Sequence, residues 1–193
     1  MSYYKIGIVF VFTVAITSIA LIIINKSNSQ VTIKETFIVN ESKIKNGSNY
    51  FVSPDYKHFA YIRKIKHETK SSKSFKKKYY YRYQLVVDKK PQDPCTLITD
   101  VSYSKDSKRI TYICRYANTN FNVEKVIVNN VLGPTYDYID KLKFNADGQH
   151  FAYRALRDAK SFLVIDHKEM MELDGRITNF IFSRDGDAII ALI

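Results

Sequence analysis

Residues 142–154, LKFNADGQHFAYR, predict a β-hairpin. One apolar–polar alternation leads into NADG (145–148), and a second alternation leaves it. Asp and Asn side chains accept backbone hydrogen bonds within tight turns, and Gly supplies a positive φ. In the departing strand, Phe151 and Tyr153 should lie on one face and His150 and Ala152 on the other. The stretch is therefore interpreted as strand, tight turn and strand.

The same pattern occurs three more times, as YFVSPDYKHFAYI (50–62), VSYSKDSKRITYI (101–113) and FIFSRDGDAIIAL (180–192). The turn residues that align the four copies are Asp55, Asp106, Asp147 and Asp185. We interpret each as capping its own turn rather than binding a metal, because the repeats hold them apart. Tyr56 and Ser107 stand where the later copies have Gly, which predicts looser turns in the first two copies.

A tyrosine follows six residues after the turn aspartate in the first three copies, as Tyr61, Tyr112 and Tyr153, and Ala191 takes its place in the fourth. A residue repeated at one position of every unit is expected to pack between units. An apolar run that ends at Asp or Asn follows each of the first three hairpins: QLVVDKK (84–90), KVIVNNV (125–131) and FLVIDHKEM (162–170). Each repeat should therefore hold about four strands.

Repeats of about 40 residues with four strands each are typical of β-propeller blades. The FNADGQHFAYR and FLVIDHK stretches resemble the WD40-like repeats of TolB-type propellers. They are also similar to the propeller blades of prolyl-oligopeptidase-type enzymes, over residues 50–193. The resemblance implies a propeller that contacts another protein of the cell envelope. WD40 repeats proper are not indicated, because the chain has no Trp.

The predicted fold class is all-β: a small or incomplete propeller-like array of about four four-stranded blades, preceded by one transmembrane helix. The expected repeats are about 50–100, 101–141, 142–179 and the C-terminal hairpin 180–193. Closed propellers need at least four blades. Residues 31–49, which contain VTIKETFIV, could complete the last blade. The alternatives are an open arc, whose exposed edges would favour self-association, and a piece of a longer protein.

Residues 6–24, IGIVFVFTVAITSIALIII, carry no charge. A helix of this length would be about 28 Å long, close to the thickness of the bilayer hydrocarbon. We expect a short flank (1–5), a transmembrane helix or signal anchor (6–25) and a linker (26–49). The β domain is then expected outside the cytoplasm, although the flanking lysines alone lean slightly the other way. The alternatives are secretion after cleavage near Ser29 and a buried soluble helix.

The formal net charge of +11 is concentrated in one segment. Between Arg63 and Arg82 there are nine Lys or Arg against Glu68 alone, so this segment carries +8 and the rest +3. It contains SFKKKYYYRY (74–83), in which basic and aromatic residues are interleaved as on single-stranded nucleic-acid surfaces. We expect the stretch from about Arg63 to Lys78 to form an extended hairpin tip that projects from the surface. This tip is either merely solvated or bound to an anionic partner such as lipid headgroups or polysaccharide, with nucleic acid disfavoured by the membrane segment. Its candidate contact residues are Lys64, Lys66, Lys70, Lys73, Lys76, Lys77, Lys78 and Arg82.

Motifs for an enzyme, a cofactor or a metal are not found: the sequence lacks G-x-S-x-G, a P-loop, G-x-G-x-x-G and H-E-x-x-H. His58 and His150 occupy equivalent repeat positions, which favours a structural role. Cys95 and Cys114 match no zinc or redox spacing. They could form a disulfide in an oxidising compartment or remain reduced in the cytoplasm.

The expected function is a membrane-anchored, non-enzymatic binding or scaffold module of the cell envelope that contacts protein partners. The second reading is an anionic-surface binder acting through residues 63–82. The third is a truncated member of a propeller-containing peptidase-type family that lacks its catalytic domain.

Overall fold

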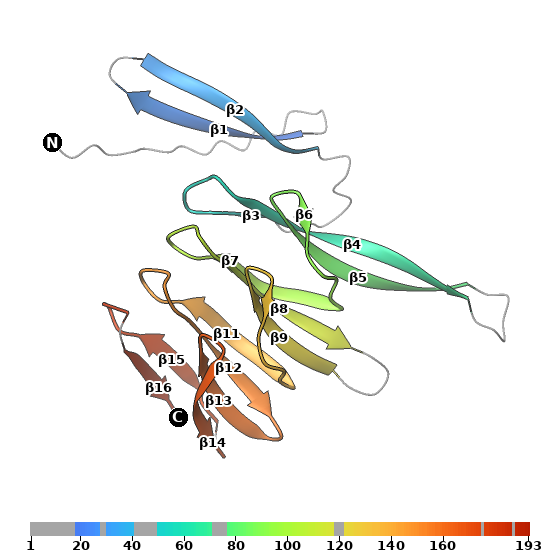
Figure 1. Cartoon of the computed structure of the whole chain (residues 1–193), viewed down its shortest axis with the longest axis vertical. Helices are drawn as coiled ribbons and strands as arrows, with labels where there is room; N and C mark the ends of the chain where they lie inside the picture. Colours follow the sequence, from blue (N-terminus) through green and yellow to red (C-terminus); the bar gives the residue numbers. More distant parts are fainter. Residues whose placement is uncertain are drawn as a thin grey trace. The chain divides into compact units, whose positions relative to one another are not determined.

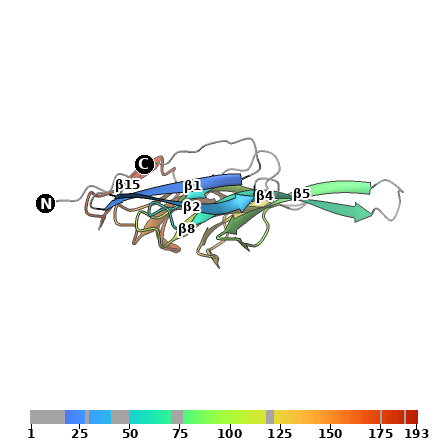
Figure 2. The same cartoon turned by 90° about the horizontal axis from the view of Figure 1, so that it is seen from above.

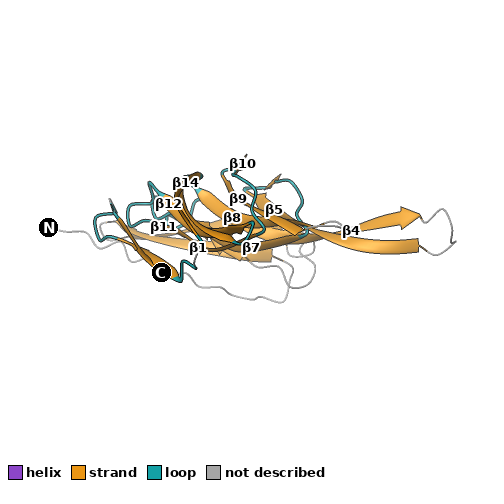
Figure 3. Ribbon diagram, turned by 90° about the horizontal axis from the view of Figure 1, so that it is seen from below, coloured by secondary structure: helices purple, strands orange, loops and turns teal. Residues whose placement is uncertain are grey.

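The computed structural model describes residues 18–27, 30–40, 50–70, 77–117, 122–174, 176–186 and 188–193. These residues form strands and turns, with no helix among them (Figure 3). Several antiparallel sheets of four strands make up most of the described chain. The described part of the chain is therefore all-β, with sheets compatible with a propeller-like arrangement.

The chain divides into two units, residues 1–48 and 49–193, which are described separately. In the first unit, β1 (Ser18–Ser27) pairs antiparallel with β2 (Gln30–Asn40). Residues 18–24 of the predicted membrane helix thus lie in a strand, because a run rich in isoleucine suits either structure. Residues 6–17 lie outside the described part, so the helix stays a prediction. The described residues contain no helix that could span a membrane.

The second unit contains three complete four-stranded blades, which follow one another along the chain (Figure 1). Blade 1 consists of β3 (Tyr50–Val52), β4 (Phe59–Lys70), β5 (Lys77–Val87) and β6 (Lys90–Pro91). Blade 2 consists of β7 (Leu97–Tyr103), β8 (Ile110–Ala117), β9 (Asn122–Val128) and β10 (Val131–Leu132). Blade 3 consists of β11 (Tyr138–Phe144), β12 (Phe151–Arg157), β13 (Lys160–Ile165) and β14 (Lys168–Leu173).

A hairpin of two strands, β15 (Asn179–Phe182) and β16 (Ile189–Leu192), follows the three complete blades. We call this hairpin blade 4. Among the described strands, β16 pairs only with β15, and β2 pairs only with β1. The possible pairing of residues 31–49 with blade 4 would join the two units, and residues 41–49 lie outside the described part. Closure of a ring therefore stays a prediction.

The four turns between the first and second strands share one set of hydrogen bonds. In blade 3, Asp147 accepts the N–H of Gln149 at 2.7 Å, and Asn145 accepts the N–H of His150 at 3.0 Å. The residue after the turn aspartate has a positive φ in all four copies: 60° at Tyr56, 62° at Ser107, 77° at Gly148 and 88° at Gly186. The looser turns expected at Tyr56 and Ser107 were wrong, because the side-chain bonds of Ser53 and Ser104 hold the same geometry without glycine.

The core lies between successive blades, where each second strand contributes alternate residues to its two faces. Tyr112 packs between blades 1 and 2, and Tyr153 packs between blades 2 and 3, so the predicted role of these tyrosines is confirmed. Phe151 lies on the same face of β12 as Tyr153, whereas Ala152 faces blade 4. Tyr61, the first copy, is only partly buried and packs beside Phe59 at a ring distance of 6.0 Å. The alternation in the sequence therefore determines which side chains of a strand pack against the preceding blade and which pack against the following blade.

Candidate binding surfaces

The basic segment is a two-stranded arm that extends the hairpin of blade 1. Strands β4 and β5 pair continuously from Ala60 opposite Val87 to Lys70 opposite Lys77. The arm extends past the other sheets of its unit (Figure 1, Figure 2). The predicted projecting hairpin is present, but its strands run further than a loop over residues 63–82 allows, because aromatic and long side chains pair well across strands. Only residues 71–76 of the segment lie outside the described part.

Lysines lie over tyrosine rings on one face of this arm. The Nζ of Lys64 is 3.9 Å from the ring centroid of Tyr81, and the Nζ of Lys66 is 3.6 Å from that of Tyr79. The tyrosine rings are about half exposed, at 46% and 47% of their full accessibility. Cation–π contacts at exposed sites contribute roughly 0.5–1 kcal/mol each. The arm therefore presents positive charge on an ordered aromatic surface.

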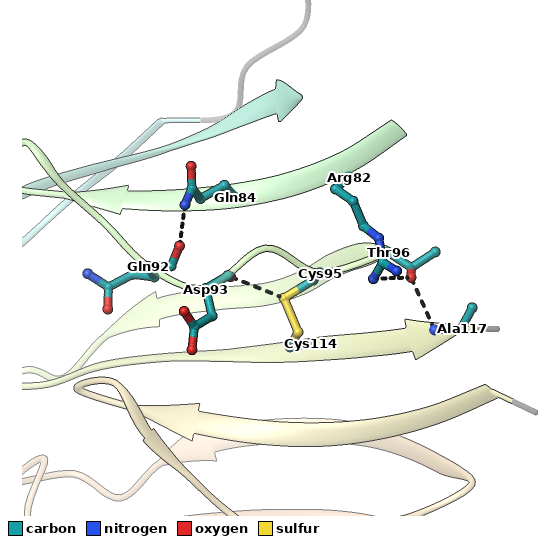
Figure 4. Close-up of a disulfide and its surroundings, with 8 residues drawn as sticks. All are labelled: Arg82, Gln84, Gln92, Asp93, Cys95, Thr96, Cys114 and Ala117. Atoms are coloured by element: carbon teal, nitrogen blue, oxygen red, sulfur yellow. Dashed lines mark hydrogen bonds between the residues drawn. A yellow bond between two sulfur atoms is a disulfide. The ribbon is translucent and has the colours of Figure 1, made fainter. Parts of the chain in front are cut away.

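The opposite face of the arm is also aromatic and basic. The His67 and Tyr80 rings stack with centroids 4.9 Å apart, and Arg82 lies 6.0 Å above the Tyr80 ring. Arg82 also donates a hydrogen bond to the Thr96 hydroxyl at 3.3 Å (Figure 4). Of the other predicted contact residues, Lys70, Lys77 and Lys78 belong to the paired strands, and Lys73 and Lys76 lie outside the described residues.

A disulfide joins Cys95 to Cys114 at the base of the arm (Figure 4). Both cysteines are fully buried between blades 1 and 2, with their Cα atoms 5.6 Å apart. Cys95 exchanges two backbone hydrogen bonds with Tyr83 of β5, at 2.7 and 2.8 Å. The covalent link therefore fixes the root of the arm to β8 of the next blade.

The turn aspartates line up along the blades without forming a metal site. The N–H of Asp55 in turn 1 donates to the Ser107 hydroxyl of turn 2 at 2.9 Å. Hydrogen bonds from the serine hydroxyls two residues before them lower the pKa of Asp55 and Asp106. Their ligand capacity is thus used by their own turns, and no group of three metal-ligating side chains occurs among the described residues.

The two equivalent histidines pair with the aspartates that end third strands. His58 Nδ1 lies 2.7 Å from Asp88, and His150 Nδ1 lies 2.5 Å from Asp166. The other oxygen of each aspartate accepts a backbone N–H of the second strand, from Phe59 or Phe151. The pairs therefore link the second and third strands of their own blade, which is a structural use of both residues.

Blade 4 exposes an apolar face, and among the described strands β16 pairs with β15 alone. Ile181, Ile190 and Leu192 point away from blade 3 and are about half exposed, with Ile190 at 54%. On the other side, a groove of about 330 Å³ separates the hairpin from the outer strands of blade 3. Its apolar walls are Ile165 and Met170 of blade 3 and Phe182 and Ile189 of blade 4.

No protein-family model matches the chain, and no curated protein matches it either. The resemblance to WD40-like propellers therefore rests on the repeat pattern alone.

Sequence reasoning missed the groove and the lysine–tyrosine contacts. No local motif marked the groove, because residues of two blades line it. The alternation in Lys64–Ile65–Lys66 against Tyr79–Tyr80–Tyr81 was the available sign of a paired arm.

Proposed function

We propose that the chain is a non-enzymatic binding or scaffold module of the cell envelope, anchored by residues 6–24, that contacts a protein partner through its blades. The observation that carries the proposal is the exposed apolar face of blade 4. Large exposed apolar surfaces beside an unpaired strand edge are typical of protein interaction sites. The buried Cys95–Cys114 disulfide supports a domain outside the cytoplasm, since such bonds persist in oxidising compartments.

A photo-crosslinking amino acid at Ile190 of the full chain in cells tests this proposal. We expect one discrete heteromeric adduct on irradiation, identified by mass spectrometry. The control is the same substitution at Val131 of β10, which is 63% exposed but lies in blade 2. An adduct from Val131 but none from Ile190 would contradict the proposal.

The arm favours a second function, contact with an anionic surface such as lipid headgroups. Lys64 and Lys66 are ordered over tyrosines, so less side-chain entropy is lost when they bind an anion. Tyrosines with adjacent lysines also suit a membrane interface. We expect the chain to bind vesicles containing anionic lipid and to be released by salt.

The matched test replaces both Lys64 and Lys66 with Ser, and the control variant replaces Lys57 and Lys108 in the turns with Ser. Loss of vesicle binding only in the arm variant would support the second function. Equal binding by both variants would remove it without touching the proposed protein contact.

A further inference from the structure

The outer part of the arm is a two-stranded ribbon that pairs with no other described strand. The pairing of β3 with β4 ends at Tyr61, and β5 bridges to Cys95 at Tyr83. Beyond these contacts, β4 and β5 pair only with each other, out to Lys70 opposite Lys77 (Figure 2). The six residue pairs beyond Tyr83 correspond to roughly 20 Å of ribbon. A ligand can therefore approach this part of the arm from either face.

Aromatic and basic side chains lie on both faces of the ribbon. The first face carries two lysine–tyrosine pairs, which are Lys64 with Tyr81 and Lys66 with Tyr79. The second face carries the ring of Tyr80, which is 44% exposed and contacts a histidine and an arginine of the arm. A flat surface reaches only one of these faces at a time. A ligand that uses both faces has to bend around the ribbon, as a flexible linear molecule does.

The 193 residues contain no acidic segment that matches the charge of the arm. No two acidic residues are adjacent in the sequence, and residues 1–49 contain two acids in all. The most acidic stretch is 166–174, and its two glutamates already pair with Arg157 and Lys160 of their own blade. A second copy of the chain would bring another arm of the same charge, which repels the first. The counter-charge therefore has to come from a ligand.

A lipid bilayer can use only one face of the ribbon. The outer end of the arm, residues 70–78, contains five lysines and no acid. Charged side chains are costly in hydrocarbon, so the arm does not enter a bilayer with this end first. An arm that lies flat on the headgroups leaves its second face, with Tyr80, in water. The aromatic and basic content of both faces thus favours a ligand other than a membrane.

The lysine–tyrosine pairs also distinguish a polysaccharide from a single-stranded nucleic acid. The ammonium groups of Lys64 and Lys66 lie over the tyrosine rings of the first face, where a base would stack. The tyrosines remain about half exposed, so their hydroxyls can bond to the hydroxyl and acidic groups of a sugar. The buried disulfide at the root of the arm favours an oxidising compartment outside the cytoplasm, away from most nucleic acid.

We propose that the arm binds a linear acidic polysaccharide, a polymer of sugars with regularly spaced carboxylate or sulfate groups, which contacts both faces of the ribbon. The inference rests on the second function, contact with an anion through the arm, and names its ligand class. The acidic groups pair with Lys64 and Lys66 on the first face. On the second face, the Tyr80 hydroxyl bonds to the same polysaccharide where it bends around the ribbon.

The test uses the purified full chain in a non-ionic detergent and a fluorescent oligogalacturonate long enough to span the ribbon. We expect saturable binding by fluorescence anisotropy that weakens as salt is added. Unlabelled dextran, which is neutral, should not compete. Replacing Lys64 and Lys66 with Ser should weaken binding by about fivefold for each lysine, because each removes one charge from the contact. Binding unchanged by this double substitution would overturn the proposal.

A conservative substitution tests whether the second face takes part. Tyr80→Phe removes one hydroxyl and keeps the ring that stacks with His67, so the arm stays paired. Binding of the oligogalacturonate should weaken by about fivefold, because a hydrogen bond to the sugar is lost. The matched control is Tyr138→Phe in β11 of blade 3, which is 42% exposed and should bind like the parent. Equal binding by the two variants would overturn the two-faced contact.

Other anions give results that would overturn the proposal. Polyglutamate with the same number of carboxylates should bind more weakly, and equal binding would mean that the arm recognises charge alone. Tighter binding of oligothymidylate would assign the arm to a nucleic acid. Vesicle binding that depends on Lys64 and Lys66, without any oligogalacturonate binding, would remove this inference and leave the second function standing. Loss of both would remove the second function as well.

Discussion

Blades 3 and 4 begin with the same hairpin and differ in how much of it is buried. Their turns match: Gly148 N–H donates to the Asn145 carbonyl at 3.2 Å, and Gly186 N–H to the Ser183 carbonyl at 3.1 Å. In blade 3, blade 4 covers the outer face of this hairpin, so Ala152 is buried, whereas its counterpart in blade 4, Ile190, is exposed. The comparison teaches that the turn is encoded locally, while burial depends on strands that come from elsewhere.

The largest expected effect comes from shortening a core side chain of the complete blade. Phe162→Ala should lower the free energy of unfolding by about 3–5 kcal/mol, because it leaves a cavity between blades 2 and 3. The matched change Ile190→Ala should stay within about 0.5 kcal/mol, as expected for an exposed site. Urea unfolding of the purified chain measures both. Equal losses would mean that blade 4 is covered in solution, which would break the comparison.

Removal of the disulfide should cause the second-largest loss of stability. Replacing both Cys95 and Cys114 with Ser opens a loop with a sequence separation of 19 residues, which should lower stability by about 3 kcal/mol. Thermal unfolding of the parent in reductant is the control and should match the double variant. Alkylation in cells lysed with denaturant and without reductant tests the compartment, since denaturation exposes both buried cysteines. Thiols that react under these conditions would place the domain in the cytoplasm.

Substitutions at the position after the turn aspartate should change the free energy of unfolding differently in the first blade and in the later ones. A Cβ at Gly148 would lie 3.1 Å from Ser104 Cβ and 3.2 Å from the Lys105 nitrogen, and φ there is +77°. Gly148→Tyr should therefore lower the free energy of unfolding by roughly 2 kcal/mol. The mirror change Tyr56→Gly should stay within about 1 kcal/mol, since it relieves a positive φ. Similar losses from both would contradict the packing described between the turns.

The smallest effect is a dependence on pH at His167 of blade 3. Burial lowers the pKa of this imidazole, which packs against Phe151 at a ring distance of 4.9 Å. The unfolded chain then binds the proton more readily, so stability is full above the unfolded pKa and falls as pH drops below it. Melting temperatures between about pH 7.5 and 5.5 measure this slope, with an unfolded pKa of about 6.5. His167→Asn should flatten the slope, and an unchanged slope would assign it to other groups.

The sequence predicted turns and buried faces, which depend on a few neighbouring residues. It did not predict features that depend on strand register or on packing between blades. Asp147 and Gly148 specify a turn through local hydrogen bonds and a positive φ. The apolar–polar alternation around Tyr112 and Tyr153 predicts that one face of each strand is buried. The paired arm depends on Lys66 meeting Tyr79 across strands, which a charge count does not contain. The groove lies between Ile165 of blade 3 and Ile189 of blade 4, so it depends on how two blades pack and no single repeat contains it.

Each turn contacts the turn before it through the residue that follows its aspartate, and this determines where an additional repeat could be inserted. Gly148 sits against turn 2 and Gly186 against turn 3, so each unit presents a small residue to the unit before it. Tyr56 is the exception, and its ring is 38% exposed. A unit duplicated after blade 2 or blade 3 would fit at once, whereas one inserted before blade 1 would first need Tyr56 replaced by a small residue. The array of turns is thus directional: turns 3 and 4 each place a glycine against the turn before them, whereas turn 1 carries a tyrosine at that position.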